Sequence, residues 1–282
     1  MRWREYRSVL TQAGQGWSEH DASRLSAALS FYAILSLAPL LVIAVTIAAF
    51  FLDTESVRVA LQTQATDSLG KGASDLVVAI IDHASRPATS VPATIIAILI
   101  SFYAASGLFG QIEDAVEHIW GIKHEGHPVR LFIMSRVKSV LLLLAFLLLF
   151  LSWLAADSIL GWLARTAGGF AGWPFVSLVV STLFATFVFA ITFRGIPRGR
   201  VLWRDVWPGA VTTGLGFSIT KFILSLYFTY SGVAAAYGSA GALVVILLWI
   251  YYSSQIFFFG AEITRVVALR RKPKAAAASV PL

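Results

Sequence analysis

Long apolar runs separated by polar segments dominate the chain. A transmembrane helix needs about 20 mostly apolar residues to cross the hydrocarbon of a bilayer. Runs of about this length recur along the 282 residues. They predict an all-α, polytopic membrane domain over residues 25–264, with six transmembrane helices at about 27–52, 91–112, 136–158, 173–193, 207–228 and 241–262.

A long polar segment, residues 53–90, separates the first two apolar runs. It contains two helical patterns, Glu55–Leu69 and Ser74–Ala84. Apolar residues recur in the second pattern at Leu76, Val77, Ile80, Ile81 and Ala84. This spacing places them on one face of a helix. We therefore expect an external helical hairpin that caps the membrane bundle.

The two ends of the chain are basic. Residues 1–24 carry aromatic and apolar side chains at near-helical spacing among arginines. This pattern fits either an amphipathic helix on the anionic cytoplasmic face of the membrane or a solvated helical tail. Residues 265–282 change from Lys and Arg to an alanine run, and we expect a disordered cytoplasmic tail.

Charge distribution gives the orientation of the bundle. Only 13% of the residues are charged and 57% are hydrophobic, whereas a soluble domain has about 25% charged residues. Seventeen Lys and Arg residues fall on the side of the two termini and four on the other side. Since positive residues favour the cytoplasm, both termini are predicted to be cytoplasmic. The net charge of +7 then reflects topology, and we expect no nucleic-acid partner.

Lys221 is the one charge well inside a predicted span. An ionisable residue at such depth is a functional candidate, because it is costly to bury in lipid. Alternatively, its long stem reaches the outer headgroups. Asp157 lies at comparable depth and is the first partner to test.

Acidic residues mark the ends of the second and last spans: Glu113, Asp114, Glu117 and Glu262. Apolar residues continue at helical spacing beyond the second span, so we expect a helix with one apolar and one acidic face. The acids either form a gate that attracts cations or accepts protons, or they anchor the helix through ion pairs. The basic residues available for such ion pairs are Arg136, Lys138, Arg194 and Arg204.

Polar residues within the spans suggest a substrate path: Ser30, Tyr32, Ser36, Tyr103, Lys221 and Gln255. Three further positions are candidate hinges: Pro39, Gly238 and Gly241. Small residues also permit close helix packing without a path, so both interpretations stay open. The chain has no cysteine and no nucleotide-binding or hydrolase motif. We expect no metal, no cofactor and no enzymatic activity.

Four blocks resemble the BrkB/YihY family of bacterial inner-membrane proteins: 27–41, 101–120, 207–210, and 237–252 followed by 260–262. The resemblance implies six helices in the bacterial inner (plasma) membrane, cytoplasmic termini, and a link to envelope integrity and virulence. A ribonuclease label attached to the family looks mistaken, because the spans leave no soluble domain. The resemblance implies no established catalytic or ligand-binding residues for this chain.

These observations together predict a transporter or flippase-like protein that moves a lipid or another amphipathic or anionic solute for envelope integrity. Membrane lipids are the expected partners. The alternative is a non-transporting membrane scaffold or envelope-assembly factor that uses its external hairpin to bind other proteins.

Overall fold

The computed structural model describes residues 3–48, 54–69, 71–84, 103, 107–122, 141–142, 144–145, 148–149, 152, 173–196, 201–230 and 240–271. Its labelled elements are α1 (Trp3–Glu19), α2 (Ala22–Ala48), α3 (Thr54–Leu69), α4 (Lys71–Ala84), α7 (Trp173–Gly195), α8 (Trp203–Tyr230) and α10 (Gly241–Arg271). Residues 107–119 form a further helical stretch. No β-strand occurs within these ranges, so the predicted all-α class is confirmed for them.

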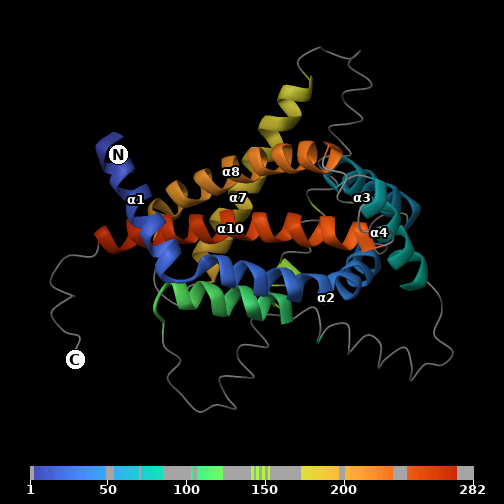
Figure 1. Ribbon diagram of the computed structural model, residues 1–282, viewed down its shortest axis with the longest axis horizontal. Helices are drawn as coiled ribbons and strands as arrows, with labels where there is room; N and C mark the ends of the chain where they lie inside the picture. Colours follow the sequence, from blue (N-terminus) through green and yellow to red (C-terminus); the bar gives the residue numbers. More distant parts are fainter. Residues whose placement is uncertain are drawn as a thin grey trace.

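The long helices form one bundle, with α1 at one end and the α3–α4 hairpin at the other (Figure 1). Helix α10 packs against both α8 and α2, and α7 packs against α8. Helix α1 lies beside the C-terminal end of α10, whereas α3 and α4 lie at the opposite end of the bundle (Figure 1). The bundle therefore separates the first helix from the α3–α4 hairpin by the length of the long helices.

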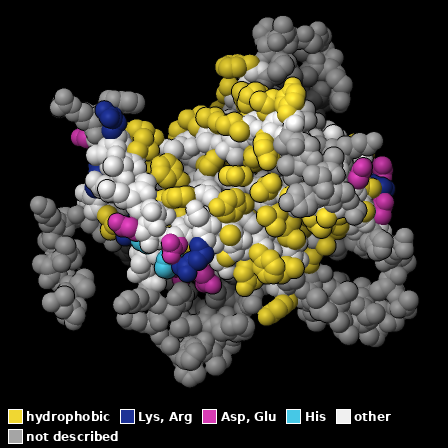
Figure 2. Space-filling view, in the orientation of Figure 1, with side chains coloured by type: hydrophobic (Ala, Val, Ile, Leu, Met, Phe, Trp, Pro, Cys, Tyr) yellow, Lys and Arg dark blue, Asp and Glu magenta, His cyan; other side chains and the backbone are white. Residues whose placement is uncertain are grey.

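Large apolar side chains are spread over the face of the bundle that Figure 2 shows. Phe175 on α7 and Phe222 on α8 are each 70% exposed, and Leu183 and Ile219 are also exposed. Soluble monomers rarely expose apolar patches on this scale, whereas lipid tails solvate such side chains. The outer surface is therefore that of a membrane protein.

Three described helices are long and apolar enough to cross a membrane: Ala22–Leu41, Phe175–Gly195 and Gly241–Arg271. They overlap the first, fourth and sixth predicted spans. Helix α10 continues beyond the predicted end of the sixth span, so residues 265–271 are helical and the expectation of a disordered segment from residue 265 is wrong for them. The fifth predicted span lies within α8, a continuous helix of 28 residues. The second and third fall mainly outside the described residues, so the number of six spans stays a prediction.

The predicted helical hairpin is present as α3 and α4. Val57, Leu61 and Ala65 of α3 form one buried cluster with Val77 and Ile81 of α4. Helix α4 begins at Lys71, three residues earlier than its apolar pattern suggested, because helix termini carry polar residues that the pattern does not detect. The location of the hairpin outside the membrane stays a prediction.

Helix α1 packs its apolar face on protein. Val9 and Ala13 are fully buried in a cluster with Ile263, Val266 and Val267 of α10. The hydroxyl of Tyr6 is also hydrogen-bonded to that of Thr212 on α8, at 2.7 Å. The N-terminal segment is therefore an integral part of the bundle end, held there by α10 and α8.

A tight corner joins α1 to α2. Asp21 has a φ of 50°, in the left-handed region that Asp tolerates better than most residues. The N–H of His20 donates to the carbonyl of Gly16, and the N–H of Arg24 donates to the carbonyl of Asp21. The corner turns the chain within two residues and fixes the position of His20 against α10.

Candidate functional site

A carboxylate with no solvent exposure, that of Glu262 on α10, lies at the centre of the candidate site. Its Oε1 is 2.5 Å from Nδ1 of His20 at the α1–α2 corner. Its Oε2 is 3.5 Å from a terminal guanidinium nitrogen of Arg265, one turn further along α10. The carboxylate therefore joins the corner to the last helix through one imidazole and one guanidinium.

Gly16 on α1 makes room for this carboxylate. A Cβ at Gly16 would lie 2.7 Å from Oε2 of Glu262, closer than side-chain contacts allow. Because glycine has no Cβ, the backbone of α1 can approach the carboxylate directly. The site is thus built from α1, the α1–α2 corner and α10 together.

Two further acids are buried on the helical stretch 107–119. Glu113 and Glu117 each have 1% exposure, whereas Asp114 is exposed. Glu113 and Glu117 are four residues apart and so share one side of the helix, while Asp114 lies about a quarter turn away. The expected acidic face is therefore divided, with two glutamates in the core and the aspartate on the surface.

This stretch reaches the same end of the bundle as Glu262. The rings of His118 and His20 meet edge to face with their centroids 5.9 Å apart. Ala115 and Ile119 also share one hydrophobic core cluster with Ala22 and Ala261. Three buried carboxylates thus gather at one end of the bundle: Glu113 and Glu117 from 107–119, and Glu262 from α10.

The helix 107–119 ends in a defined C-cap. Gly121 has a φ of +64°, and the N–H of Ile122 donates to the carbonyl of Glu117 while the N–H of Gly121 donates to that of His118. This is the Schellman arrangement, which favours glycine at the left-handed position. The cap stops the helix one turn beyond Glu117 and so fixes how far the acidic residues extend.

The side chains of the predicted substrate path face in different directions. The hydroxyls of Ser30 and Ser36 are buried and donate to carbonyls on their own helix, each at 2.7 Å. Tyr32 and Tyr103 are exposed on the outer surface, and Lys221 and Gln255 are half-buried. Of the candidate hinges, Pro39 lies inside α2, Gly241 is buried at the first position of α10, and Gly238 lies outside the described residues.

Several predicted partners for the charged residues lie elsewhere. Asp157 is outside the described residues, so its pairing with Lys221 stays a prediction. The guanidinium of Arg194 lies over the ring of Trp203, with its carbon 4.3 Å from the centroid. His20, the observed partner of Glu262, was not predicted, because 242 residues separate the two in sequence.

Across the described ranges, no three His, Asp or Glu side chains form a group suited to one metal ion.

Comparisons with known proteins give the family. A family model described as "Virulence factor BrkB" matches residues 13–281. The ribonuclease-like protein YfkH of Bacillus subtilis is 26% identical over 94% of this chain and 97% of its own length. A UPF0761 membrane protein of Aggregatibacter aphrophilus is 24% identical over 96% of this chain and 95% of its own.

A UPF0761 membrane protein of Chromohalobacter salexigens is 25% identical over 92% of this chain, which spans 62% of that relative's length. No solved structure matches. The membrane proteins among the relatives agree with the apolar outer surface of the bundle. On the match over residues 13–281, this membrane protein belongs to the family of the virulence factor BrkB.

Proposed function

We propose that this protein carries an amphipathic or anionic molecule, such as a lipid, across a bacterial inner membrane, and that Glu262 and His20 exchange a proton during the cycle. One observation carries the proposal: the carboxylate of Glu262 has no solvent exposure and lies 2.5 Å from the imidazole of His20. Ionisable groups buried in membrane proteins are costly and commonly belong to proton relays or substrate paths. Both termini face the cytoplasm in this proposal.

In this proposal, a proton that moves to or from His20 or Glu262 changes the contact between the α1–α2 corner and α10. Imidazole is the side chain that gains and loses a proton most readily near neutral pH. Since His20 lies at the α1–α2 corner and Glu262 on α10, a change of charge on either side chain alters the attraction between these elements. Proton exchange would thus shift α1 and α2 relative to α10 and open or close the end of the bundle.

Reconstitution into liposomes tests the proposal. Lipid scrambling and the flux of an anionic solute are measured for the wild type, Glu262→Gln, His20→Gln and the control Asp75→Asn, which removes an exposed charge on α4. We expect the first two variants to lose at least about tenfold in flux, which corresponds to about 1.4 kcal/mol, while their unfolding temperatures stay near that of the wild type. The control should keep full flux.

Two results would overturn the proposal. Absence of flux above empty liposomes for every envelope lipid and solute tried would exclude transport. Full flux in Glu262→Gln with a lowered unfolding temperature would instead make the carboxylate a structural anchor.

A second candidate function is a membrane scaffold or envelope-assembly factor. The observation that favours it is the contact of α8 with α10, where a Cβ at Gly209 would lie 2.5 Å from the carbonyl oxygen of Gly260. Backbones this close leave no passage between these two helices. A wild-type protein that is stable in liposomes but gives no flux would support this second function.

A further inference from the structure

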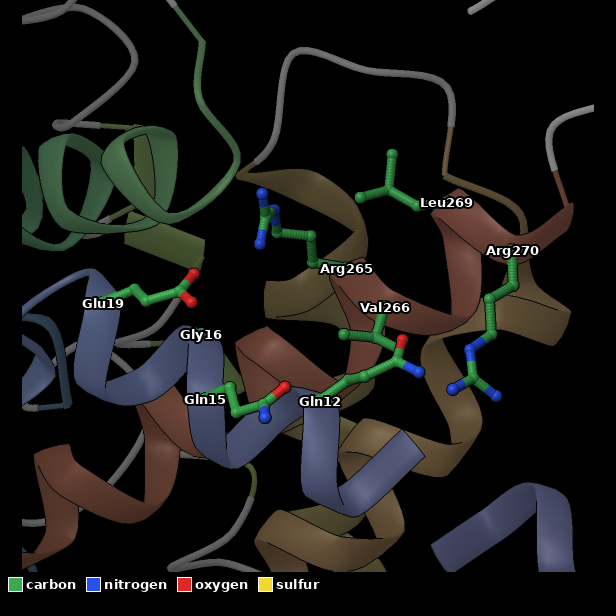
Figure 3. A pocket seen from close by; sticks show the side chains of 8 residues that line it. All are labelled: Gln12, Gln15, Gly16, Glu19, Arg265, Val266, Leu269 and Arg270. Atoms are coloured by element: carbon green, nitrogen blue, oxygen red, sulfur yellow. The ribbon is translucent and has the colours of Figure 1, made fainter. Parts of the chain in front are cut away.

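A cleft of about 400 Å³ lies between α1 and the last turns of α10 (Figure 3). Its described lining consists of Gln12, Gln15, Gly16, Glu19, Arg265, Val266, Leu269 and Arg270. Sites for small molecules commonly have volumes of roughly 300–1,000 Å³. The cleft is therefore large enough for a phosphate group with a short substituent.

Two arginines approach the cleft from α10. Arg265 contacts Glu262 at 3.5 Å through one terminal nitrogen, and Arg270 donates one hydrogen bond of 2.9 Å to the hydroxyl of Ser8. A guanidinium has five N–H donors, so each arginine keeps donors for a ligand. Their planar donor pairs match the oxygens of a phosphate.

The remaining lining side chains complete an anion site. Gln12 and Gln15 on α1 offer amide N–H donors opposite α10, and Val266 and Leu269 offer apolar contacts. The acidic side chain of the lining, Glu19, lies at the far end of the cleft from Arg270 (Figure 3). The guanidinium of Arg265 extends to the side of the cleft where Glu19 lies (Figure 3). An anion away from the carboxylate of Glu19 would therefore lie between Arg270 and Gln12.

The position of the cleft along the bundle suits binding of a lipid headgroup. Trp203 and Trp207, in the first turns of α8, are exposed, and exposed tryptophans are typical of the membrane–water interface. Asp205 lies between them and pairs with Arg271 of α10 at 2.6 Å. This ion pair places the end of α10, and with it the cleft, at the level of the tryptophans.

We propose that this cleft binds a phosphate-bearing anion through Arg270 and Gln12. Two sources carry that chemistry: the headgroup of an anionic phospholipid and a free phosphate. Binding does not depend on the proposed transport, and the test measures binding alone.

The test uses the purified full chain in a neutral, phosphate-free detergent. Native mass spectrometry measures retention of phosphatidylglycerol, with phosphatidylcholine as the reference lipid, and inorganic phosphate is added as a second probe and as a competitor. The variants Arg270→Gln and Gln12→Glu change the charge of the cleft without touching Glu262. Arg7→Gln removes an exposed charge from α1 outside the described lining and is the matched control.

We expect Arg270→Gln and Gln12→Glu each to weaken binding about tenfold, since a hydrogen bond to a charged group is worth roughly that factor. Arg7→Gln should bind as the wild type does. If inorganic phosphate displaces phosphatidylglycerol, the phosphate group alone is sufficient for binding. If the lipid is retained in the presence of inorganic phosphate, the whole headgroup is the ligand. Either result supports the site. The proposal is overturned if neither probe binds the wild type, if both cleft variants bind as well as the wild type, or if Arg7→Gln weakens binding equally.

Discussion

Replacing Gly260 by alanine should loosen the crossing of α8 and α10, because the two backbones nearly touch there. A Cβ at Gly260 would overlap the hydroxyl of Thr213 and lie 3.0 Å from Cζ of Phe193. On the other helix, a Cβ at Gly209 would overlap the hydroxyl of Thr264 and lie 2.5 Å from the carbonyl oxygen of Gly260. One added methyl group at either position therefore has no space unless the helices move apart.

The expected loss of stability follows from two opposing terms. Overpacking a well-packed core costs up to about 3 kcal/mol. Alanine in place of glycine in a helix interior gains about 1 kcal/mol, so the net loss in the free energy of unfolding is up to about 2 kcal/mol. At about 2–4 °C per kcal/mol for a domain of roughly this size, that upper value lowers the unfolding temperature by about 4–8 °C.

Thermal unfolding of the detergent-purified protein, followed by tryptophan fluorescence, measures this fall. Gly14→Ala on α1 is the matched control, because a Cβ there meets no atom within 4 Å; its unfolding temperature should stay the same or rise. Adding Thr213→Ala to Gly260→Ala should recover part of the loss, because the overlapping hydroxyl is removed. Adding Thr264→Ala to Gly209→Ala should recover less, because the backbone carbonyl of Gly260 remains in the way.

The reasoning fails if Gly209→Ala and Gly260→Ala unfold at the temperature of Gly14→Ala. The helices would then separate at no cost, and the crossing would not be a tight contact.

Three further predictions concern other parts of the molecule. Leu61→Ala should lower the free energy of unfolding by about 2–3 kcal/mol, because it opens a cavity between α3 and α4. Hydrogen exchange should then rise in these two helices, whereas the control Val59→Ala, at an exposed position, should change it little. Tyr6→Phe should lower the free energy of unfolding by about 1 kcal/mol, because it removes the hydrogen bond to Thr212. The unfolding temperature measures this loss, and a variant as stable as the wild type would contradict the prediction. Exchanging the charges of Lys221 and Asp157 together should restore a function that each single reversal abolishes; two inactive but expressed single variants with an inactive double variant would exclude the pairing.

Local patterns predicted the helices well. The apolar spacing in 74–84 predicted a helix that buries Val77 and Ile81, and the structure confirms both. Such patterns are reliable because a helix with one apolar face must pack that face somewhere. The long apolar runs likewise predicted the helices that cover Ala22–Leu41, Phe175–Gly195 and Gly241–Arg271.

The site was harder to predict because its partners are distant in sequence. Glu262 stood out as an acid at the end of an apolar run, but nothing near His20 indicates that its imidazole contacts α10. The three acids of 113–117 looked alike in sequence, and only their angular positions on the packed helix separate the buried Glu113 and Glu117 from the exposed Asp114. Which side of a helix becomes buried depends on the neighbours it meets, and a single sequence does not specify them.

The contact between α1 and α10 also has a consequence for synthesis of the chain. His20 and Glu262 are 242 residues apart, so a ribosome adding roughly 5–20 residues per second needs about 12–48 s between them. During that interval Val9 and Ala13 lack the apolar partners that bury them in the finished protein. A chain that stops before α10 leaves this face of α1 open to chaperones and proteases, so the cell can distinguish finished from unfinished copies at the place where α1 meets α10.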